Sequence, residues 1–293
     1  MQKKIIALAI ASALTVPAVA IADSVGNVAM YGQVNLSLDR TNDGMATNSQ
    51  TSNNMVNNSS RLGVAGSEDL GGGLAGVFQV EGEVDANNGT SGAALTFDRN
   101  TFLGLKSADF GTFLAGNYDT AYKASTRYLD LFADIAAADN RKHAAGLGKG
   151  HDVYRNNSLT YKSPSMSGFS VNASVAKAQA AAQEGGSFSL AGMYSMDNMM
   201  ATLAYDKVKS PTVLTLTTAE SKAVKLGGSY SIDAFKVNAV VEKLTSTPVT
   251  SPASTGDTTG TNWYLGGQYS LSETDAIKLA YAKKGDAKTA GAA

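Results

Sequence analysis

Apolar and polar residues alternate with a period of two over nearly the whole sequence. In the first such segment Met30, Val34 and Leu38 have one parity. Gln33 and Asp39 have the other parity. A period of two places successive side chains on opposite faces of a β-strand, whereas an amphipathic helix repeats every 3.6 residues. The pattern therefore predicts an all-β chain in which each strand has one apolar and one polar face.

The same alternation returns in later segments, with glycine, serine and tyrosine at some of the positions. The clearest of these segments are 74–83, 169–175, 224–232 and 263–271. Along the whole chain the pattern predicts about thirteen strands of roughly 8 to 12 residues.

Short and long connections between these strands alternate along the chain. The short ones contain Gly, Asn, Asp or Pro, as tight hairpins require, and lie near 69–72, 108–111, 164–168, 197–198, 233–234 and 273–275. The long ones are rich in Asn, Ser, Thr, Gly and Ala, and lie near 40–58, 85–95, 118–153, 178–187, 208–221 and 245–260. Short turns at one end and long loops at the other are typical of an antiparallel barrel in an outer membrane.

The N-terminal residues 1–22 have the features of a secretory signal peptide. Lys3 and Lys4 precede an apolar run from Ile5 to Val16, and Ala20-Ile21-Ala22 is a small-residue cleavage pattern. The run has about twelve residues, fewer than the roughly 20 that a membrane-spanning helix needs. No later stretch approaches 18 consecutive apolar residues. We therefore expect export of a mature chain, residues 23–293, without a transmembrane helix.

The composition excludes several classes of protein. There is no cysteine, and only two histidines, His143 and His151, are present, so we expect no disulfide, no thiolate metal site and no cofactor. The formal net charge of −1 and the pI of about 6.1 argue against nucleic-acid binding, which needs a basic surface. Redox enzymes, zinc enzymes and nucleic-acid-binding proteins are therefore not expected.

A soluble sandwich or a lipocalin-like barrel would also alternate, but such folds stay near eight or nine strands. Here the residues of the polar parity are small and hydrophilic over about thirteen strands, which suits a water-filled lumen. The residues of the apolar parity suit contact with lipid. Aromatic residues near strand ends are typical of membrane interfaces; they are Tyr194, Tyr205, Tyr230, Trp263 and Tyr281. The membrane barrel is favoured, and because a barrel in lipid must close, thirteen strands are expected to be only part of it.

Three segments carry a resemblance to a known family. They are Ser60–Leu74 (SRLGVAGSEDLGGGL) continuing to Glu81, Arg99–Leu105 followed by Phe110-Gly111-Thr112, and Tyr154–Tyr161 followed by Ser163-Pro164. In their order and spacing they resemble the general porins of Gram-negative bacteria, of the betaproteobacterial type. The resemblance covers nearly all of the predicted mature chain.

This resemblance implies a transmembrane antiparallel β-barrel of the sixteen-stranded porin type in the outer membrane. It also implies a homotrimer surrounded by lipid and lipopolysaccharide, through which small hydrophilic solutes and ions diffuse passively. Such porins have three strands more than the pattern shows before Ala293. We therefore expect the barrel of residues 23–293 to be incomplete at its C-terminus.

The long connection 118–153 contains the candidate constriction. Leu129, Phe132, Ala133 and Ala136 have helical spacing, with charged residues on a neighbouring stripe, which predicts a short amphipathic helix. In related porins this third loop folds into the lumen, where its acids face basic residues of the wall. Facing rows of charge are how pores select ions by sign. The residues expected to line the constriction are Asp119, Asp130 and Asp134 from the loop and Arg61, Arg99 and Arg155 from the wall.

Two alternatives stay open for these charges and for the function. The charges could equally be solvated or paired locally, and because those of the loop cancel, the sign of ion selectivity is left open. The barrel could also be a surface adhesin or receptor that acts through its extracellular loops. Enzyme signals are weak: His143 and His151 lie near Asp152, but a catalytic triad needs a convergent geometry that sequence does not supply. No enzymatic activity is predicted.

Overall fold

A computed structural model of the protein describes ten segments of the chain. They are residues 8–10, 20–21, 27–42, 51–87, 95–134, 150–177, 185–209, 220–247, 256–286 and 288–289. The strands are β1 (Leu8–Ile10), β2 (Ala20–Ile21), β3 (Asn27–Gln33), β4 (Leu36–Asn42), β5 (Thr51–Asn57), β6 (Arg61–Gly71), β7 (Leu74–Val84), β8 (Leu95–Thr96), β9 (Thr101–Ser107), β10 (Gly111–Asp119), β11 (Tyr154–Lys162), β12 (Phe169–Lys177), β13 (Gly186–Met196), β14 (Met199–Lys209), β15 (Glu220–Ile232), β16 (Phe235–Thr247), β17 (Thr258–Ser270), β18 (Ala276–Lys283) and β19 (Lys288–Thr289). Within these segments α1 (Ala121–Thr126) is the one α-helix.

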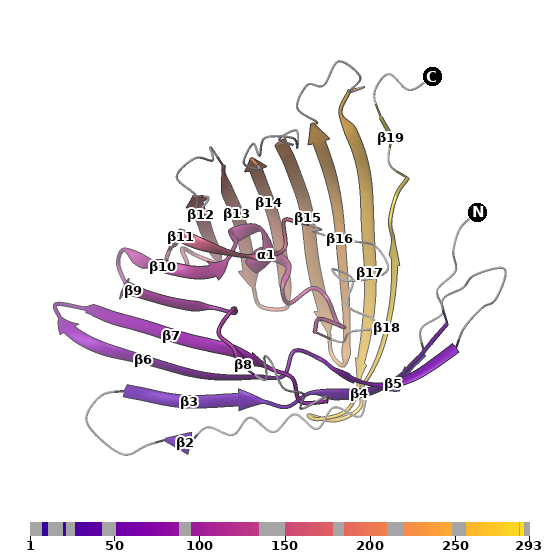
Figure 1. The fold of residues 1–293 in the computed structure, drawn as a ribbon, viewed down its shortest axis with the longest axis horizontal. Coiled ribbons are helices and arrows are strands. Elements are labelled where there is room, and N and C mark those ends of the chain that lie inside the picture. Colours follow the sequence, from indigo (N-terminus) through magenta and orange to yellow (C-terminus); the bar gives the residue numbers. More distant parts are fainter. Residues whose placement is uncertain are drawn as a thin grey trace.

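The main sheet is antiparallel. β3 pairs with β6, β6 with β7 and β7 with β9, and from β9 to β18 each strand pairs with the next one in the chain. The sheet curves strongly, and α1 lies on its concave side (Figure 1). β3 and β4 can be counted as one interrupted strand, and so can β5 and β6. With β7 and the ten strands β9 to β18, the sheet then has thirteen strands. The predicted all-β class and strand number are confirmed. The sheet is one continuous curved sheet, whereas a soluble sandwich would have two sheets packed face to face.

The first hairpin is longer than the sequence pattern predicted. Residues 40–58 were expected to form a loop, but β4 continues to Asn42 and β5 pairs with it from Thr51. The strands are interrupted where Asn58 N–H donates to the Asn35 carbonyl at 2.8 Å. The prediction was wrong because polar Asn- and Ser-rich residues satisfy their backbone groups in an antiparallel ladder as well as apolar ones do.

The sheet has two edges in the described part of the chain. β18 pairs with β17 alone, whereas β3 pairs with β6 and with the two-residue β2. A further short segment, β1, pairs with β4. No helix in the described segments is long and apolar enough to cross a membrane.

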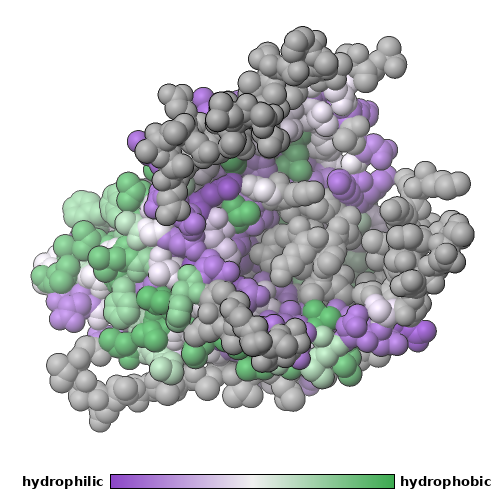
Figure 2. Space-filling view, in the orientation of Figure 1, coloured by the Kyte–Doolittle hydropathy of each residue, from purple (hydrophilic) through white to green (hydrophobic). Residues whose placement is uncertain are grey.

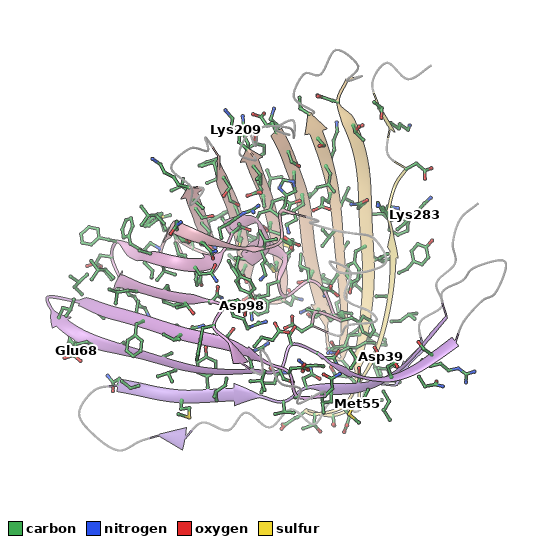
Figure 3. All side chains as sticks on the ribbon, in the orientation of Figure 1. Asp39, Met55, Glu68, Asp98, Lys209 and Lys283 are labelled. Carbon is green, nitrogen blue, oxygen red and sulfur yellow. The ribbon has the colours of Figure 1, made fainter. Side chains whose placement is uncertain are left out.

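The predicted short turns lie at one end of the strands and the long connections at the other. Glu68 is near the short-turn end of β6, and Lys209 is the last residue of β14 before a long connection (Figure 3). Two-residue hairpin turns need positive φ, which Asp tolerates better than most residues. Asp197 and Asp233 have φ of 49° and 51° in two of the two-residue turns.

The strands carry their apolar parity on the outside. Leu203, Leu226 and Leu265 are 50 to 61% exposed, whereas the intervening Ala204, Lys225 and Tyr264 are almost completely buried on the concave side. In Figure 2 green apolar residues gather over the short-turn ends of β6, β7, β9 and β10. Such an inverted distribution, with large apolar side chains outside, is what a lipid-facing barrel requires.

Aromatic pairs form a belt on the outer face near the short turns. The ring centroids of Phe169 and Tyr194 are 4.4 Å apart, and those of Phe235 and Tyr269 are 4.6 Å apart. Each pair joins neighbouring strands at their short-turn ends. Amphipathic rings at this height are typical of the boundary between hydrocarbon and headgroups.

The two faces of β15 predict opposite responses to the same substitution. Leu226→Arg places a cation on the outer face, which costs about 2–4 kcal/mol near the bilayer midplane. Ser229→Arg, on the same strand, places it on the concave face, where water can solvate it. We expect Leu226→Arg to lower the folded fraction in lipid vesicles, measured by gel mobility without boiling, and Ser229→Arg to fold nearly as well as the wild type. Equal folding of the two variants would contradict the assignment of the faces.

Candidate constriction site

The connection between β10 and β11 turns into the concave side of the sheet and begins with α1. Thr120 caps the helix, since its Oγ1 accepts from the Lys123 N–H at 3.1 Å. Two wall serines accept the other free N–H groups of the first turn. Ser174 Oγ of β12 accepts from Ala121 at 3.1 Å, and Ser189 Oγ of β13 accepts from Tyr122 at 2.8 Å. The start of the loop is therefore bonded to the wall through its backbone.

The helix lies earlier in the loop than the sequence predicted. The apolar spacing predicted helix from Leu129 onwards, but α1 ends at Thr126 and the chain forms turns up to Asp134, while Ala136 lies outside the described residues. The wall takes the hydrogen bonds that a longer helix would use. Asn238 donates to the Leu129 carbonyl at 2.8 Å, and the Leu131 N–H donates to the Tyr264 hydroxyl at 3.0 Å.

Apolar contacts hold the loop against a bed of small wall residues. Tyr122 is fully buried against alanines of three adjacent strands, which are Ala191, Ala204 and Ala223. Leu129 packs against Val240 and Tyr264. Gly227 leaves room for this contact, because a Cβ there would lie 2.6 Å from Leu129 Cδ1.

The first described part of the loop, residues 120–134, reaches a different part of the sheet where it ends. Asp134 Oδ2 lies 3.3 Å from Arg61 Nη1 of β6, while Leu131 contacts β17 and accepts from Lys278 of β18 at 3.4 Å. Residues 120–134 thus run from β12 across the inside of β13 to β18 and reach β6 at Asp134. This part of the loop contacts the edge strand β18 and, on the other side of the concave face, β6, which is one strand away from the other edge.

The structure places Asp119 in a buried local network. Asp119 is 3% exposed and its carboxylate contacts Lys123 Nζ at 2.6 Å and Arg127 Nη1 at 3.4 Å. Asn100 also donates to it, at 3.2 Å. Asp119 was predicted to lie in the loop, but it is the last residue of the wall strand β10. Its partners are Asn100 and two cations of the loop that follows, and none of the three predicted wall arginines is among these contacts.

Arg99 has partners on the wall, and Arg155 has one in the loop and one on the wall. Arg99 Nε lies 2.6 Å from Glu81 Oε1, and its Nη1 lies 3.5 Å from Glu83. Arg155 donates to the Gly150 carbonyl at 2.6 Å and lies 4.0 Å from Asp206. Of the predicted acid–arginine facings, the structure brings Asp134 and Arg61 together.

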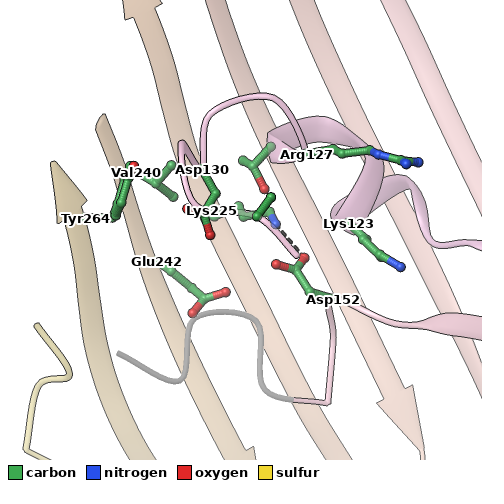
Figure 4. A pocket seen from close by; sticks show the side chains of 10 residues that line it. Lys123, Arg127, Asp130, Asp152, Lys225, Val240, Glu242 and Tyr264 are labelled. Carbon is green, nitrogen blue, oxygen red and sulfur yellow. Dashed lines mark hydrogen bonds and ion pairs between the residues drawn. The ribbon is translucent and has the colours of Figure 1, made fainter. Parts of the chain in front are cut away.

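Asp130 lines a small pocket between the loop and the wall (Figure 4). Its Oδ1 accepts from the Phe132 N–H at 2.9 Å, which shapes the turn. Lys225 of β15 also lines the pocket and pairs with Asp152 at 2.6 Å. The loop and the wall therefore both contribute charges to this pocket.

The sequence reading missed wall residues that hold the loop. Lys225 stacks over the Tyr122 ring, with Nζ 3.9 Å from the ring centroid, and Glu242 accepts a hydrogen bond from the Tyr122 hydroxyl. Burial and the nearby Glu242 carboxylate raise the pKa of Tyr122 far above its usual range, so that the phenol keeps its proton and donates. Strand parity shows that Lys225 and Glu242 face inward, but nothing in sequence shows which loop residue they meet.

The two histidines are only partly covered by the structure. His143 lies outside the described residues. His151, at the end of the loop, is 1% exposed and lies between Asp206 and Ser221 of the wall.

A curved antiparallel sheet with an apolar outer face, a polar concave face and a loop folded across it is the architecture of a membrane β-barrel channel. The whole of residues 7–293 matches the family model described as Gram-negative porin. The chain belongs to this family, which confirms the resemblance seen in the sequence. It is an outer-membrane protein that forms a channel for passive diffusion.

Individual relatives and solved structures agree with the family. The chain is 27% identical over 292 residues to outer membrane porin protein 32 of Delftia acidovorans, a match that covers 96% of this chain and 80% of that protein. It is 25% identical to the major outer membrane protein P.IB of Neisseria lactamica, over 83% of this chain and 71% of the relative.

The fold is also that of solved porins. An anion-selective porin from Comamonas acidovorans superposes with a TM-score of 0.71 at 22% identity, over 88% of this chain and 78% of the other. Salmonella typhi OmpF superposes with a TM-score of 0.64 at 17% identity, over 88% and 79% of the two chains.

The contact between the loop and Gly227 generates a test of how the loop is held. Gly227→Val overpacks the site where Leu129 is buried and is expected to cost about 1–3 kcal/mol and to displace the loop. We expect a changed single-channel conductance in planar bilayers. Gly192→Val is the matched control, because a Cβ there has nothing within 4 Å. If Gly227→Val conducts like the wild type, the loop does not depend on this contact.

Proposed function

We propose that loop 120–153 forms the constriction of this channel and that small hydrophilic solutes and ions pass beside it. The observation that carries the proposal is the course of the loop, which is bonded to β12 at its start and contacts Arg61 of β6 through Asp134. A loop that crosses the lumen reduces its width without blocking it. The constriction charges would then be Asp130 and Asp134 on the loop, with arginines on the wall and at the end of α1.

In two ion pairs the arginine is more exposed to water than its carboxylate partner, which favours anions in the lumen. Arg127 is 39% exposed, whereas Asp119 behind it is 4% exposed. Arg155 is 25% exposed, whereas Asp206 behind it is 0% exposed. Water in the lumen therefore meets the guanidinium groups before their carboxylates.

Carboxylates that are themselves partly exposed reduce this preference for anions. Arg61 and Asp134 are both partly exposed, and Glu83 is 39% exposed beside the buried Arg99. We therefore propose a moderate anion preference, set by which charge of each pair faces the water. The anion-selective porin of Comamonas acidovorans, named for that property, has the same fold.

Charge substitutions on the loop should move selectivity in opposite directions. Arg127→Gln removes an exposed cation and should shift the reversal potential under a salt gradient towards cations. Asp130→Asn with Asp134→Asn removes loop acids and should shift it towards anions. The measurement is the reversal potential of channels in planar bilayers.

Lys243→Gln is the control for this series, because Lys243 has the outward parity of β16 and should leave the reversal potential unchanged. An unchanged potential in the Asp130→Asn, Asp134→Asn double variant would remove these acids from the constriction. A shift of Arg127→Gln towards anions would overturn the proposed role of Arg127.

The proposal includes the assembly and export of the protein. We propose that residues 1–22 are a cleaved signal peptide, that the protein is a homotrimer among lipid and lipopolysaccharide, and that diffusion through it involves no enzymatic step. An OmpT of Vibrio cholerae with the same fold is described as a trimer form. The mass and N-terminal sequence of the protein purified from outer membranes should give three copies that begin at Asp23. A monomer, or a chain that still begins at Met1, would contradict this part of the proposal.

A further inference from the structure

Three residues from separate parts of the chain meet on the inner wall beside the end of the loop. Asp206 is on β14, Ser221 is on β15 and His151 lies in the segment that leads back to β11. Asp206 pairs with Ala223 in the ladder, so Ser221 is its diagonal neighbour on the same inward face. His151 Nδ1 lies 2.6 Å from Asp206 Oδ2, and His151 Nε2 lies 2.8 Å from Ser221 Oγ.

These contacts indicate which groups donate and which accept a proton in the two hydrogen bonds. An ionised carboxylate only accepts hydrogen bonds, so Asp206 takes the N–H on Nδ1 of the imidazole. In the neutral imidazole the lone pair of Nε2 then faces the Ser221 hydroxyl, which donates to it. A hydroxyl bonded to the free nitrogen of an oriented imidazole is the arrangement that activates serine as a nucleophile.

The site is more elaborate than the anchoring of a loop requires. The backbone at His151 is already held, because its carbonyl accepts from Thr120 Oγ1 at 3.0 Å. Asp206 is nevertheless completely buried, and its second oxygen, Oδ1, has no hydrogen-bond partner among the described residues. Burying a carboxylate is costly, and such groups concentrate at functional sites.

A cation beside the cluster indicates what it would attract. Arg155 Nη2 lies 4.0 Å from Asp206, and Arg155 Nε is buried without a hydrogen-bond partner in the part of the chain that the structure describes. Arg155 thus places a cation and a free N–H donor on the Asp206 side of the cluster. Ser221 itself is partly accessible from the concave side.

We propose that Ser221 is an activated nucleophile, with His151 as its base and Asp206 as the group that orients the base, and that it accepts acyl groups from small carboxylic esters in the lumen. This activity is additional to diffusion and independent of it. Ser221 Oγ bonds to the carbonyl carbon while its proton passes to His151 Nε2. The ester C–O bond breaks, and the leaving alcohol takes that proton. Water then releases the acid by the same route and restores the serine.

The test uses the full-length folded protein in detergent and a fluorophosphonate probe, which bonds to activated serines with loss of fluoride. Mass spectrometry of the peptides should locate one adduct at Ser221, and 4-nitrophenyl acetate should compete with it. Ser221→Ala should remove the adduct. His151→Gln should slow its formation by about 10²-fold or more, as the loss of a general base does.

Ser229→Ala is the matched control, because Ser229 has the same inward parity on β15 and should leave labelling as in the wild type. Gel mobility without boiling and channel conductance report whether each variant has folded. Labelling of the wild-type protein and competition by the ester test the proposal without any variant. Ser221 left unlabelled, labelled no faster than Ser229, or labelled equally fast in a folded His151→Gln variant would overturn the proposal.

Discussion

The pairing of every backbone N–H and C=O group is the constraint on which this structure depends. Inside a bilayer an unpaired group costs several kcal/mol, so a chain that crosses with strands must pair each strand with its neighbours. The ladders between β9 and β18 are continuous and in chain order, apart from one irregularity between β10 and β11. Because pairing is then supplied by the backbone, side chains are free to suit lipid on one face and water on the other, as Leu226 and Lys225 do side by side.

The polar face creates the second constraint, because buried charges need partners. The loop supplies them: Asp152 for Lys225, and Tyr122 for Glu242. The same contacts that satisfy these wall charges keep the loop in the lumen, so the stability of the wall and the width of the passage are linked. In the function we propose, the arginines that remain at the water surface set the charge that a solute meets.

Much of the fold follows from the sequence, and much of the site does not. Alternation and turn residues predicted every short turn and the strands apart from β5, because both signals are local. The predicted long connection 118–153 lies where the end of β10 and the start of β11 leave residues 120–153 between them. The helix was misplaced because the wall, through Asn238 and Tyr264, takes the hydrogen bonds of the residues after Thr126. Contacts such as that of His151 with Asp206 join residues 55 positions apart, and strand parity shows the face on which a side chain lies but not its partner.

The central claim is that the loop lies in the water-filled lumen while the opposite parity of the wall faces lipid. The absence of native cysteine allows a direct measurement, the single-channel conductance of variants with one cysteine before and after a charged, water-soluble methanethiosulfonate reagent is added. The account predicts a stepwise fall in conductance for Arg127→Cys and no change for Leu226→Cys. No effect at position 127, or an equal effect at position 226, would contradict it.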